Sequence, residues 1–333
     1  MEVVDVPEPG PAEAGCVVVR PEAIGLCGSD FHYFHADLGS VPDDELFPRI
    51  QGHEFSAIVE DVGPDCPSGL AVGQRVAVWP VIACGICQAC RLGRGNACER
   101  IRLIGIHLDG ALQEHIAIPA AQAFPVTGTD ARLTAFIEPM SIAVRTVVRG
   151  RVAPGERVAV LGAGPIGQAV AIAAIDRGAT VLLVDRIAAR LERGSASGAE
   201  LALVEPGDDL VARVREWGRG DLPEIVVEAT GAAEPMRAAL AAVAQTGRVL
   251  VVGLSTGEVP LPIGTLPFRE LDVLGVSTCA AEDFAAAAEI VLRNRTAVEA
   301  LISHEFALEE APEAIAFAIG HPAEAMKVLV HTG

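Results

Sequence analysis

A glycine-rich turn directly after a short apolar run is the feature that most constrains the fold of this chain. Residues 157–167 are RVAVLGAGPIG, so Gly162, Gly164 and Gly167 form G-x-G-x-x-G between a buried strand and a helix predicted over 165–177. Gly162 permits the tight turn, Gly164 lets the backbone approach a pyrophosphate, and Gly167 allows close packing of helix on strand. A purely structural turn is the alternative. The position between strand and helix favours a dinucleotide site.

An acidic residue stands where a dinucleotide-binding unit requires one. The strand TVLLVD ends with Asp185, about twenty residues after the glycine turn. Asp185 would accept hydrogen bonds from the adenosine ribose hydroxyls, and its charge would repel a 2′-phosphate. The sequence therefore predicts NAD rather than NADP as the cofactor, although Arg186 would soften that repulsion. A structural alternative, in which Asp185 is the N-cap of a helix over 187–197, is compatible with the same geometry.

The distribution of strands and helices divides the chain into two parts. Up to about residue 130, short Val/Ile runs are bounded by Gly and Pro, which is typical of an irregular β-rich domain. From residue 131 onward, helical segments alternate with buried runs, which predicts a doubly wound parallel sheet. The length of 333 residues also exceeds what one compact core usually holds. We therefore expect an α/β protein of two domains.

Half of the 8 cysteines lie in one short run, CGICQACRLGRGNAC. Cys84, Cys87, Cys90 and Cys98 would place four thiolates on one loop, which is the ligand set of a closed tetrahedral zinc site. An Fe–S cluster and a reactive dithiol are alternatives for the same residues. Because protein ligands would fill all four positions, a zinc ion here would stabilise the lobe and take no part in catalysis.

The charge and the apolar pattern exclude several classes of partner. The formal net charge is -19 and no block of Lys or Arg occurs, so binding to phosphate backbones or anionic lipid is disfavoured. No apolar stretch is long enough to span a membrane, and the N-terminus lacks the features of a signal peptide. We expect no nucleic-acid or membrane partner, and a cytoplasmic location in which disulfides are disfavoured.

Seven segments, in the right order along the chain, resemble the zinc-containing medium-chain dehydrogenase/reductase superfamily. They are GLCGSDFH, GHEFSAIVEDVG, GQRVAV, CGICQAC with its later cysteine, IEPMSIAV, VAVLGAGPIGQ, and VEATG followed by VVGLS. The run from Ile82 to His115 is most similar to L-galactonate 5-dehydrogenases, within the branch that acts on polyols, L-threonine and sugar acids. The resemblance implies a GroES-like catalytic domain over 1–138 and 280–333, and a Rossmann coenzyme domain over 139–279.

The resemblance also implies a second, catalytic zinc. Its ligands would be Cys27 and His53, with Glu54 and Glu138 as the carboxylate candidates; alcohol dehydrogenases proper have a cysteine where Glu138 stands. One thiolate, one neutral histidine and one carboxylate neutralise the ion, whereas a second carboxylate would weaken its pull on a substrate oxygen. We therefore expect one glutamate bound directly at a time, and the sequence leaves open which one. The structural alternatives are a buried supporting role for Glu54 and a helix start at Glu138, with Pro139 at the first helical position.

Three further residues match catalytic positions of the same family. Ser29 matches the hydroxyl that contacts the bound alcohol, and His32 matches the outer end of the proton relay. Asp30 matches the carboxylate that orients the zinc-binding histidine, a role with its own physical reason. An unrelated histidine, His107, is more often an ordinary residue at a strand end than a substrate contact.

The resemblance extends to the cofactor. It implies NAD contacts beyond the glycine turn and Asp185, although Arg190 could equally be a solvated helix residue and Gly253 a turn at a strand end. The implied contacts are Ile166, Arg190, Val252, Gly253, Leu254, Ser277, Thr278 and Cys279.

These features together predict an enzyme that moves a hydride from a secondary alcohol to NAD, with zinc as Lewis acid, in a cleft between two domains. The expected substrate is a polyol or a sugar acid similar to L-galactonate; L-threonine and sorbitol-type polyols are alternatives. A non-catalytic relative that senses dinucleotides is the alternative of another class. The resemblance implies a homodimer or homotetramer. It also places one more strand ahead of MEVVDVPEP, so an internal Met1 is an open alternative.

Overall fold

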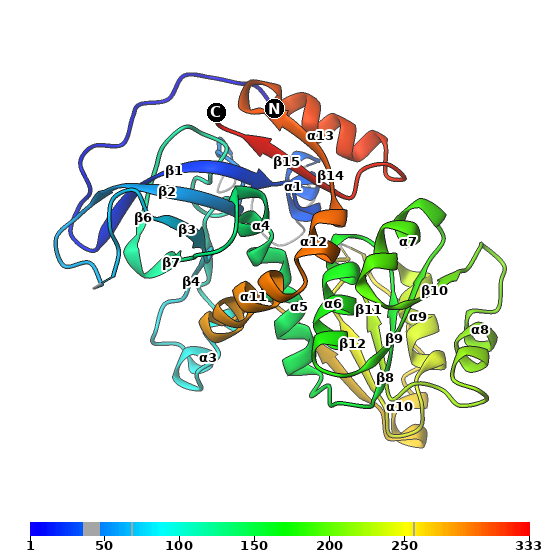
Figure 1. Ribbon diagram of the computed structural model, residues 1–333. Coiled ribbons are helices and arrows are strands. Elements are labelled where there is room, and N and C mark those ends of the chain that lie inside the picture. The colour runs from blue at the N-terminus through cyan, green and yellow to red at the C-terminus, as the bar shows by residue number, and fades with distance from the viewer. Residues whose placement is uncertain (36–46, 68, 256) are drawn as a thin grey trace. The chain divides into compact units, whose positions relative to one another are not determined.

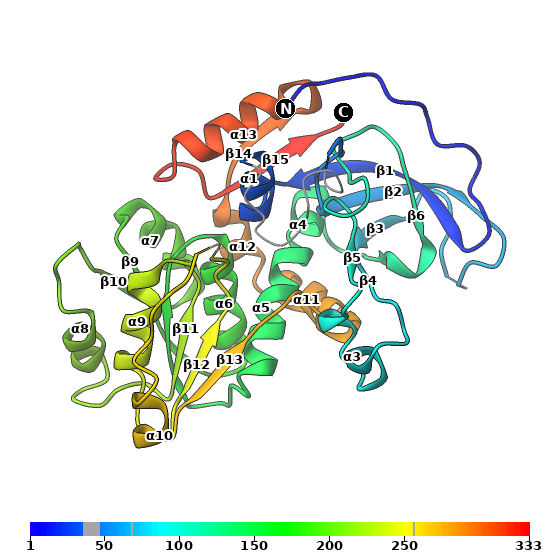
Figure 2. The ribbon, with the colours of Figure 1, turned by 180° about the vertical axis from the view of Figure 1, so that it is seen from behind.

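A computed structural model describes residues 1–35, 47–67, 69–255 and 257–333 (Figures 1 and 2). The chain forms two compact units. The β-rich unit contains Met1–Ser141, Thr278–Arg293 and Ile302–Gly333, and the parallel-sheet unit contains Ile142–Ser277 and Asn294–Leu301. No helix within the described residues combines the length and apolar character needed to cross a bilayer.

The β-rich unit is built on a seven-stranded sheet with the order β14-β15-β1-β2-β3-β7, in which β6 also pairs with β1. Strand β1 is antiparallel to β2, β6 and β15, whereas β14 and β15 are parallel. The strands of this sheet are β1 (Cys16–Gly25), β2 (Glu54–Val62), β3 (Arg75–Val78), β6 (Ile116–Pro119), β7 (Ala123–Pro125), β14 (Ile302–Ala307) and β15 (Lys327–His331). A second, two-stranded sheet joins β4 (Val81–Ile82) to β5 (Arg102–Leu103).

The β-rich unit also contains several helices. They are α1 (Gly28–Phe34), α3 (Gln88–Arg91), α4 (Ala131–Ala135), α11 (Ala281–Arg293) and α13 (Ala311–Gly320), with 3-10 turns η1 (Gly95–Ala97), η2 (Ala120–Gln122) and η4 (Leu308–Glu310). Helix α5 (Ile137–Arg149) begins in this unit and continues in the other. The core follows from period-2 alternation: Val17 and Val19 of β1 pack with Phe55 of β2 and Ile118 of β6. Helix α13 packs its apolar face on β14 and β15 (Figure 1).

The parallel-sheet unit has the strand order β10-β9-β8-β11-β12-β13, and every pair in it is parallel. Its strands are β8 (Arg157–Leu161), β9 (Thr180–Asp185), β10 (Glu200–Leu203), β11 (Ile225–Glu228), β12 (Arg248–Val251) and β13 (Asp272–Gly275). Its helices are α6 (Pro165–Asp176), α7 (Ala188–Gly194), α8 (Leu210–Trp217), α9 (Ala233–Ala242), α10 (Thr265–Arg269) and α12 (Arg295–Leu301), with η3 (Ser195–Ser197). The chain order reverses between β8 and β11, which is the topological switch point where ligands of open α/β sheets bind. The predicted doubly wound parallel sheet is confirmed.

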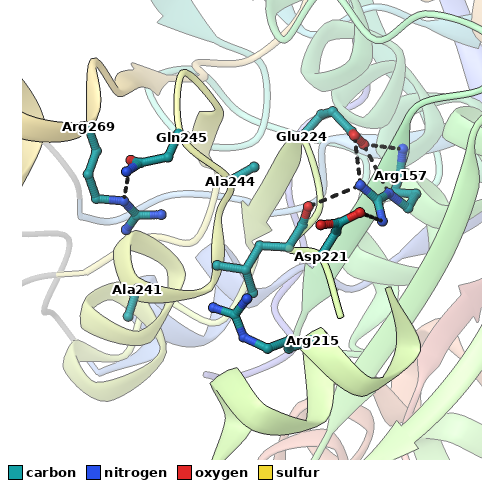
Figure 3. Close-up of a pocket in the computed structure, with 9 residues that line it drawn as sticks. Arg157, Arg215, Asp221, Glu224, Ala241, Ala244, Gln245 and Arg269 are labelled. Atoms are coloured by element: carbon teal, nitrogen blue, oxygen red, sulfur yellow. Dashed lines mark hydrogen bonds and ion pairs between the residues drawn. The ribbon is translucent and has the colours of Figure 1, made fainter. Parts of the chain in front are cut away.

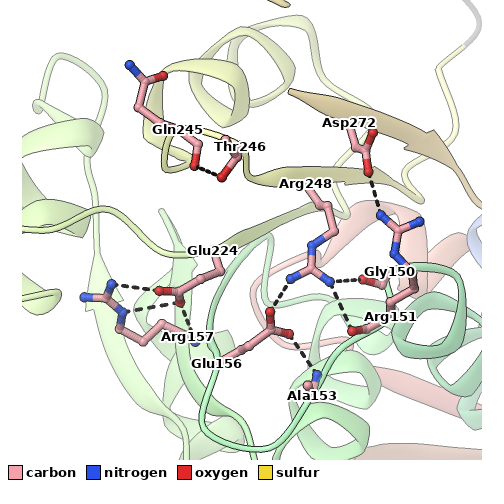
Figure 4. A network of polar contacts seen from close by, with 10 residues as sticks. All are labelled: Gly150, Arg151, Ala153, Glu156, Arg157, Glu224, Gln245, Thr246, Arg248 and Asp272. Carbon is pink, nitrogen blue, oxygen red and sulfur yellow. Dashed lines mark hydrogen bonds and ion pairs between the residues drawn. The ribbon is translucent and has the colours of Figure 1, made fainter. Parts of the chain in front are cut away.

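The opposite, amino-terminal edge of this sheet contains a polar hollow of about 550 Å³ (Figure 3). Arg157 lies at the start of β8 and bonds Glu224, which directly precedes β11, through N–H···O distances of 2.9 and 3.4 Å. Figure 4 shows that Arg248 at the start of β12 contacts Glu156, and that Arg151 bonds Asp272 at the start of β13. The charges of these three arginines are therefore balanced by carboxylates at this edge of the sheet.

Candidate metal and cofactor sites

The four cysteines of the predicted lobe come together. Cys87 is the N-cap of α3, Cys90 lies inside that helix, and Cys98 follows η1. All four sulfur atoms lie within 4.8 Å of one another, with Sγ–Sγ distances of 3.4 Å for Cys87–Cys90, 3.8 Å for Cys87–Cys98 and 3.9 Å for Cys84–Cys90. Sulfurs at zinc-binding distance on a tetrahedron are about 3.8 Å apart. The donor set therefore fits a zinc ion.

The pKa values of two of these cysteines also indicate a cation site. Hydrogen bonds from the backbone N–H groups of Ile86 and Cys87 lower the pKa of Cys84 to about 6. Burial and the neighbouring thiols raise the pKa of Cys90 to about 12. Four thiolates so close together would repel one another, so a divalent ion is what would allow all of them to ionise.

A second cluster forms from residues that are dispersed in the sequence. Cys27 is the N-cap of α1, His53 directly precedes β2, and Glu54 is the first residue of β2. One ligand atom from each lies within 4.8 Å of the others. A thiolate, an imidazole and a carboxylate are ligands that zinc accepts, and three protein ligands leave a fourth position for substrate, as catalytic zinc sites require.

His53 is held in place by its neighbours. Asp30, 1% exposed, lies with Oδ1 3.7 Å from His53 Nδ1, while its Oδ2 accepts a 2.9 Å hydrogen bond from the backbone N–H of Cys27. Ser29 Oγ is 3.5 Å from His53 Nε2. Burial alone would lower the pKa of His53, but the charges of Asp30 and Cys27 outweigh it and raise that pKa. Burial raises the pKa of Asp30, although the charge of His53 opposes the shift.

The two glutamates differ in their surroundings. Glu54 is fully buried; its Oε2 accepts a hydrogen bond from Lys327 Nζ, and its Oε1 has no hydrogen-bond partner among the described residues. Glu138 lies outside the set of three atoms within 4.8 Å, in the first turn of α5, and burial raises its pKa to about 7. Helix α5 begins at Ile137, so Glu138 does lie in the first turn of a helix, as the structural alternative predicts. Pro139 is the third residue of this helix and not the first.

An unpartnered buried carboxylate oxygen tests whether the dispersed cluster fits a metal. Leaving such an atom without a partner costs free energy, because it has lost its water and gained nothing in return. Glu54 Oε1 is in this position, next to a cysteine and a histidine. A cation at the centre of the cluster would satisfy it, so the residues present fit the catalytic zinc.

The glycine turn has the geometry of a nucleotide cradle. Gly162 has φ +103°, which strongly favours glycine, and a Cβ on Gly167 would lie 1.8 Å from the carbonyl oxygen of Gly162. Gly164 is the N-cap of α6, where no side chain caps the helix, and a Cβ on it would meet nothing within 4 Å. The open space at an uncapped helix N-terminus fits a pyrophosphate.

Asp185 supports the same turn. Its Oδ2 accepts a 2.6 Å hydrogen bond from the backbone N–H of Ala163, and its Oδ1 accepts one of 2.8 Å from Ile187. The N-cap of α7 is Ile187, two residues beyond Asp185, so the N-cap interpretation of Asp185 is wrong. The carboxylate is thus fixed at the end of β9, beside the glycine turn.

Comparison with known proteins matches the two halves of the chain to two family descriptions. Residues 13–128 match the alcohol dehydrogenase GroES-like domain, and residues 165–293 match the zinc-binding dehydrogenase domain. The L-galactonate-5-dehydrogenase of Escherichia coli K12 is 34% identical over 303 residues, which cover 91% of this chain and 86% of that protein.

The chain belongs to the zinc-containing medium-chain dehydrogenase/reductase superfamily. Two solved structures agree. A putative zinc-binding dehydrogenase from Sinorhizobium meliloti bound to NADP is 33% identical, with a TM-score of 0.86 over 99% of this chain and 94% of that one. An E. coli CFT073 alcohol dehydrogenase complexed with NADH is 27% identical, with a TM-score of 0.85 over 97% and 94%. The predicted fold class, a GroES-like domain with a Rossmann domain, is confirmed, and the protein is an oxidoreductase of the alcohol dehydrogenase family.

The remaining predicted cofactor contacts of this medium-chain dehydrogenase lie in several environments. Ile166 and Arg190 are half-buried on α6 and α7, and Gln168 donates a 2.7 Å hydrogen bond to the backbone oxygen of Arg190. Val252, Gly253 and Leu254 follow β12, and Leu254 is 64% exposed. Ser277 belongs to the parallel-sheet unit, whereas Thr278 and Cys279 belong to the β-rich unit.

Thr278 and Cys279 have structural partners in their own unit. Thr278 Oγ1 donates a 3.0 Å hydrogen bond to the backbone oxygen of Asn96, and the backbone oxygen of Cys279 accepts one of 3.3 Å from Trp79 Nε1. His32 is half-buried on α1, at the helix's last turn. His107 Nδ1 accepts a 3.1 Å hydrogen bond from the backbone N–H of Leu103, the role of an ordinary strand-end residue.

Two residues near these sites escaped the sequence analysis. Glu228, 1% exposed at the end of β11, accepts hydrogen bonds from the backbone N–H groups of Thr230 and Gly231 at 2.7 and 3.1 Å, and so fixes the loop beside Gly162. The signal was the acidic residue inside VEATG. Lys327 is the other; its signal was that it is the single lysine of the chain.

Proposed function

We propose that this dehydrogenase transfers a hydride from a secondary alcohol of a polyol or sugar acid, similar to L-galactonate, to NAD. The observation that carries the proposal is the cluster of half-buried Cys27 with buried His53 and Glu54, in which one carboxylate oxygen lacks a partner among the described residues. The similarity to an L-galactonate-5-dehydrogenase supports the substrate class. Bound zinc would supply Lewis acidity to the alcohol, and the nicotinamide would accept the hydride.

The protein's own residues would bind the ion and move the proton. In this proposal Cys27, His53 and one of the two glutamates hold the ion, and Asp30 keeps the His53 ring in its binding orientation, since its carboxylate lies 3.7 Å from Nδ1. Ser29, whose Oγ lies 3.5 Å from His53 Nε2 and therefore beside the ion, would accept the proton of the alcohol while giving up its own hydroxyl proton. His32, half-buried on the same helix, passes the proton on to water.

NAD is proposed as the cofactor in preference to NADP. Asp185 is held at the end of β9 by two backbone N–H groups, so its negative charge stays where a 2′-phosphate would have to lie. The related structures include one with NADH and one with NADP, so the fold accepts either. We assign the coenzyme role to residues 139–279 and the catalytic role to 1–138 and 280–333. A cytoplasmic location is proposed because all eight cysteines are free thiols.

A homodimer is proposed from one edge of the parallel sheet. Among the described residues the strand order ends at β13, and the segment that leads into this strand has exposed apolar side chains: Ile263 is 62% exposed and Phe268 is 89% exposed. A free strand edge with apolar neighbours pairs readily with the same edge of a second copy. Sedimentation analysis should show a dimer that Phe268→Asp weakens; unchanged assembly would contradict this interface.

The proposed function is tested by metal analysis and NADH formation together. The purified protein should contain zinc near two ions per chain, and should produce NADH from polyols or aldonates when these are screened beside L-threonine and sorbitol. Cys27→Ala should remove one zinc and the activity, whereas Cys16→Ala, a half-buried thiol outside both clusters, should remove neither. Full turnover by Cys27→Ala would refute the proposed mechanism.

A further inference from the structure

Lys327 is a buried cation that the proposed reaction does not use. It is 2% exposed at the start of β15, next to the cluster of Cys27, His53 and Glu54. Its Nζ donates one hydrogen bond to Glu54 Oε2 and one of 3.0 Å to the backbone oxygen of Leu26. No other Lys or Arg among the described residues is equally buried.

The sequence singles out this position. The chain contains 25 Lys and Arg residues, and Lys327 is the only lysine among them. Lysine presents one compact point charge on a flexible stem, whereas arginine presents a broad planar fork with five donors. A narrow, buried position that faces one carboxylate oxygen therefore suits lysine better than arginine, the residue that the chain uses at its other Lys/Arg positions.

A glycine on the neighbouring strand makes room for the ion pair of Glu54 and Lys327. Gly25 is the Cα partner of Glu54 in the β1–β2 pairing. A Cβ on Gly25 would lie 2.4 Å from Glu54 Oε2 and 3.3 Å from Lys327 Cδ. The absence of a side chain at position 25 therefore leaves room for the carboxylate and the lysine stem. Any side chain there would push Glu54 Oε2 away from Lys327.

We propose that Lys327 is a positioning residue that holds Glu54 by Oε2, so that this glutamate offers only Oε1 to the catalytic ion and leaves the substrate position open. The inference rests on the proposed zinc site. Because Oε2 is engaged by Lys327 and Oε1 has no partner in the part of the chain that the structure describes, Glu54 can act as a ligand through Oε1 only. The charge of Lys327 also offsets the second carboxylate, so Glu54 and Glu138 can both lie near one ion without making the site strongly anionic.

Loss of the lysine should therefore change the coordination of the ion. In Lys327→Met, Glu54 is released and its second oxygen can enter the position meant for substrate. Cobalt in place of zinc reports this directly, because the visible absorption of tetrahedral cobalt weakens when a fifth ligand is added. Subtracting the spectrum of the same protein with Cys27→Ala removes the contribution of the four-cysteine lobe.

The decisive comparison is between Lys327→Met alone and Lys327→Met combined with Glu54→Gln. We expect Lys327→Met to weaken the cobalt bands and to lower kcat/KM by about 10–100-fold, as is usual for residues that orient metal ligands. With Glu54→Gln, the same lysine change should leave the cobalt bands at the intensity of Glu54→Gln alone. Equal weakening with and without Glu54→Gln would overturn the inference.

Gly25→Ala tests the same contact while the lysine stays in place. Its methyl group should displace Glu54 Oε2 from Lys327 and weaken the cobalt bands as Lys327→Met does. Gly10→Ala is the matched control, since a Cβ on Gly10 meets nothing within 4 Å. Wild-type cobalt bands in Gly25→Ala would contradict the inference, and this variant keeps the test valid if Lys327→Met does not fold.

The single lysine also allows a test without activity or cobalt. Protein labelled with 13C-lysine gives one set of lysine side-chain NMR signals, and in the zinc-loaded protein Glu54→Gln should shift them more than Glu138→Gln. An equal or larger shift for Glu138→Gln would show that Lys327 does not hold Glu54 in the loaded protein. If the wild type binds no metal at Cys27, the proposed function fails; if it binds metal but the lysine effects are independent of Glu54, only this inference fails.

Discussion

The two cysteine-containing clusters of this dehydrogenase are assembled in opposite ways. The lobe draws Cys84, Cys87, Cys90 and Cys98 from one short run, and the backbone of that run supplies hydrogen bonds to its own sulfurs. The other cluster takes its atoms from the start of α1 and the start of β2, and depends on β15 for the cation beside them. The lobe is a local structure, whereas the second cluster exists only when the whole sheet has formed.

This difference predicts which property depends on which cluster. Closure of a short loop by an ion gives stability to the residues within it, and four protein ligands leave no position for a substrate. Three ligands taken from two elements that are distant in the sequence leave a position open, and their geometry depends on the groups that orient them. Changes in the lobe should therefore act on stability, and changes in the dispersed cluster on activity.

The largest effect is expected for Cys27→Ala. Mutation of a residue that only orients a metal ligand lowers activity by up to roughly 100-fold. Removing one of the three ligands themselves should lower kcat/KM by more than this and should release one of the two zinc ions. The melting temperature should change little, because Cys27 is only half-buried and the lobe keeps its ion. Metal analysis and calorimetry on the same sample check both points; a large loss of stability would break the contrast between the clusters.

Cys98→Ala should show the reverse pattern. Structural zinc contributes about 10–16 kcal/mol of binding free energy in small zinc domains, and part of this supports folding of the lobe. We expect a fall in the denaturation midpoint and early proteolysis within residues 84–98, while zinc at Cys27 is retained. Residual soluble protein should keep most of its kcat. Loss of activity without loss of stability would show that the lobe serves catalysis after all.

Asp30→Asn tests how far activity depends on the groups around the ligands. Asp30 contacts both the His53 ring and the Cys27 backbone, so its loss should misorient two ligands at once. We expect kcat/KM to fall about 10–100-fold and the zinc of this cluster to be released at lower chelator concentration, with the lobe zinc unaffected. Timed release of the two ions to a colorimetric chelator measures this, and simultaneous release would contradict it.

Sequence reasoning succeeded where the spacing of residues already contains the geometry. The cysteine run predicted a gathered lobe, and the glycine pattern predicted a turn in which Gly167 has no room for a side chain. Alternating strands and helices predicted the parallel sheet, which is confirmed. In each case the residues that act together lie on one turn or on successive elements, so the local sequence is sufficient.

It was insufficient where distant segments meet. Lys327 is 273 residues from Glu54, and nothing within KVLVH indicates that this lysine is buried against a carboxylate. Cys27, His53 and Glu54 could be grouped only through the family resemblance, because their spacing alone is a weak signal. Asp185 was open to interpretation as a helix N-cap because the exact start of α7 depends on how the glycine turn uses its carboxylate.

The smallest effect is expected for Arg91→Ala, a change at the edge of the lobe that parallels Asp30→Asn at the other cluster. Arg91 Nη1 donates a 2.5 Å hydrogen bond to the backbone oxygen of Ile86, but the pair is exposed. An exposed hydrogen bond of this kind is worth about 0.5–1.5 kcal/mol at most, and a zinc ion bound to the four cysteines would already fix the loop. We expect a small fall in the denaturation midpoint, unchanged kcat/KM and no change in chelator resistance. A marked loss of zinc from the lobe would mean that its ligands also depend on supporting side chains, and the contrast between a self-sufficient lobe and a fold-dependent catalytic cluster would no longer hold.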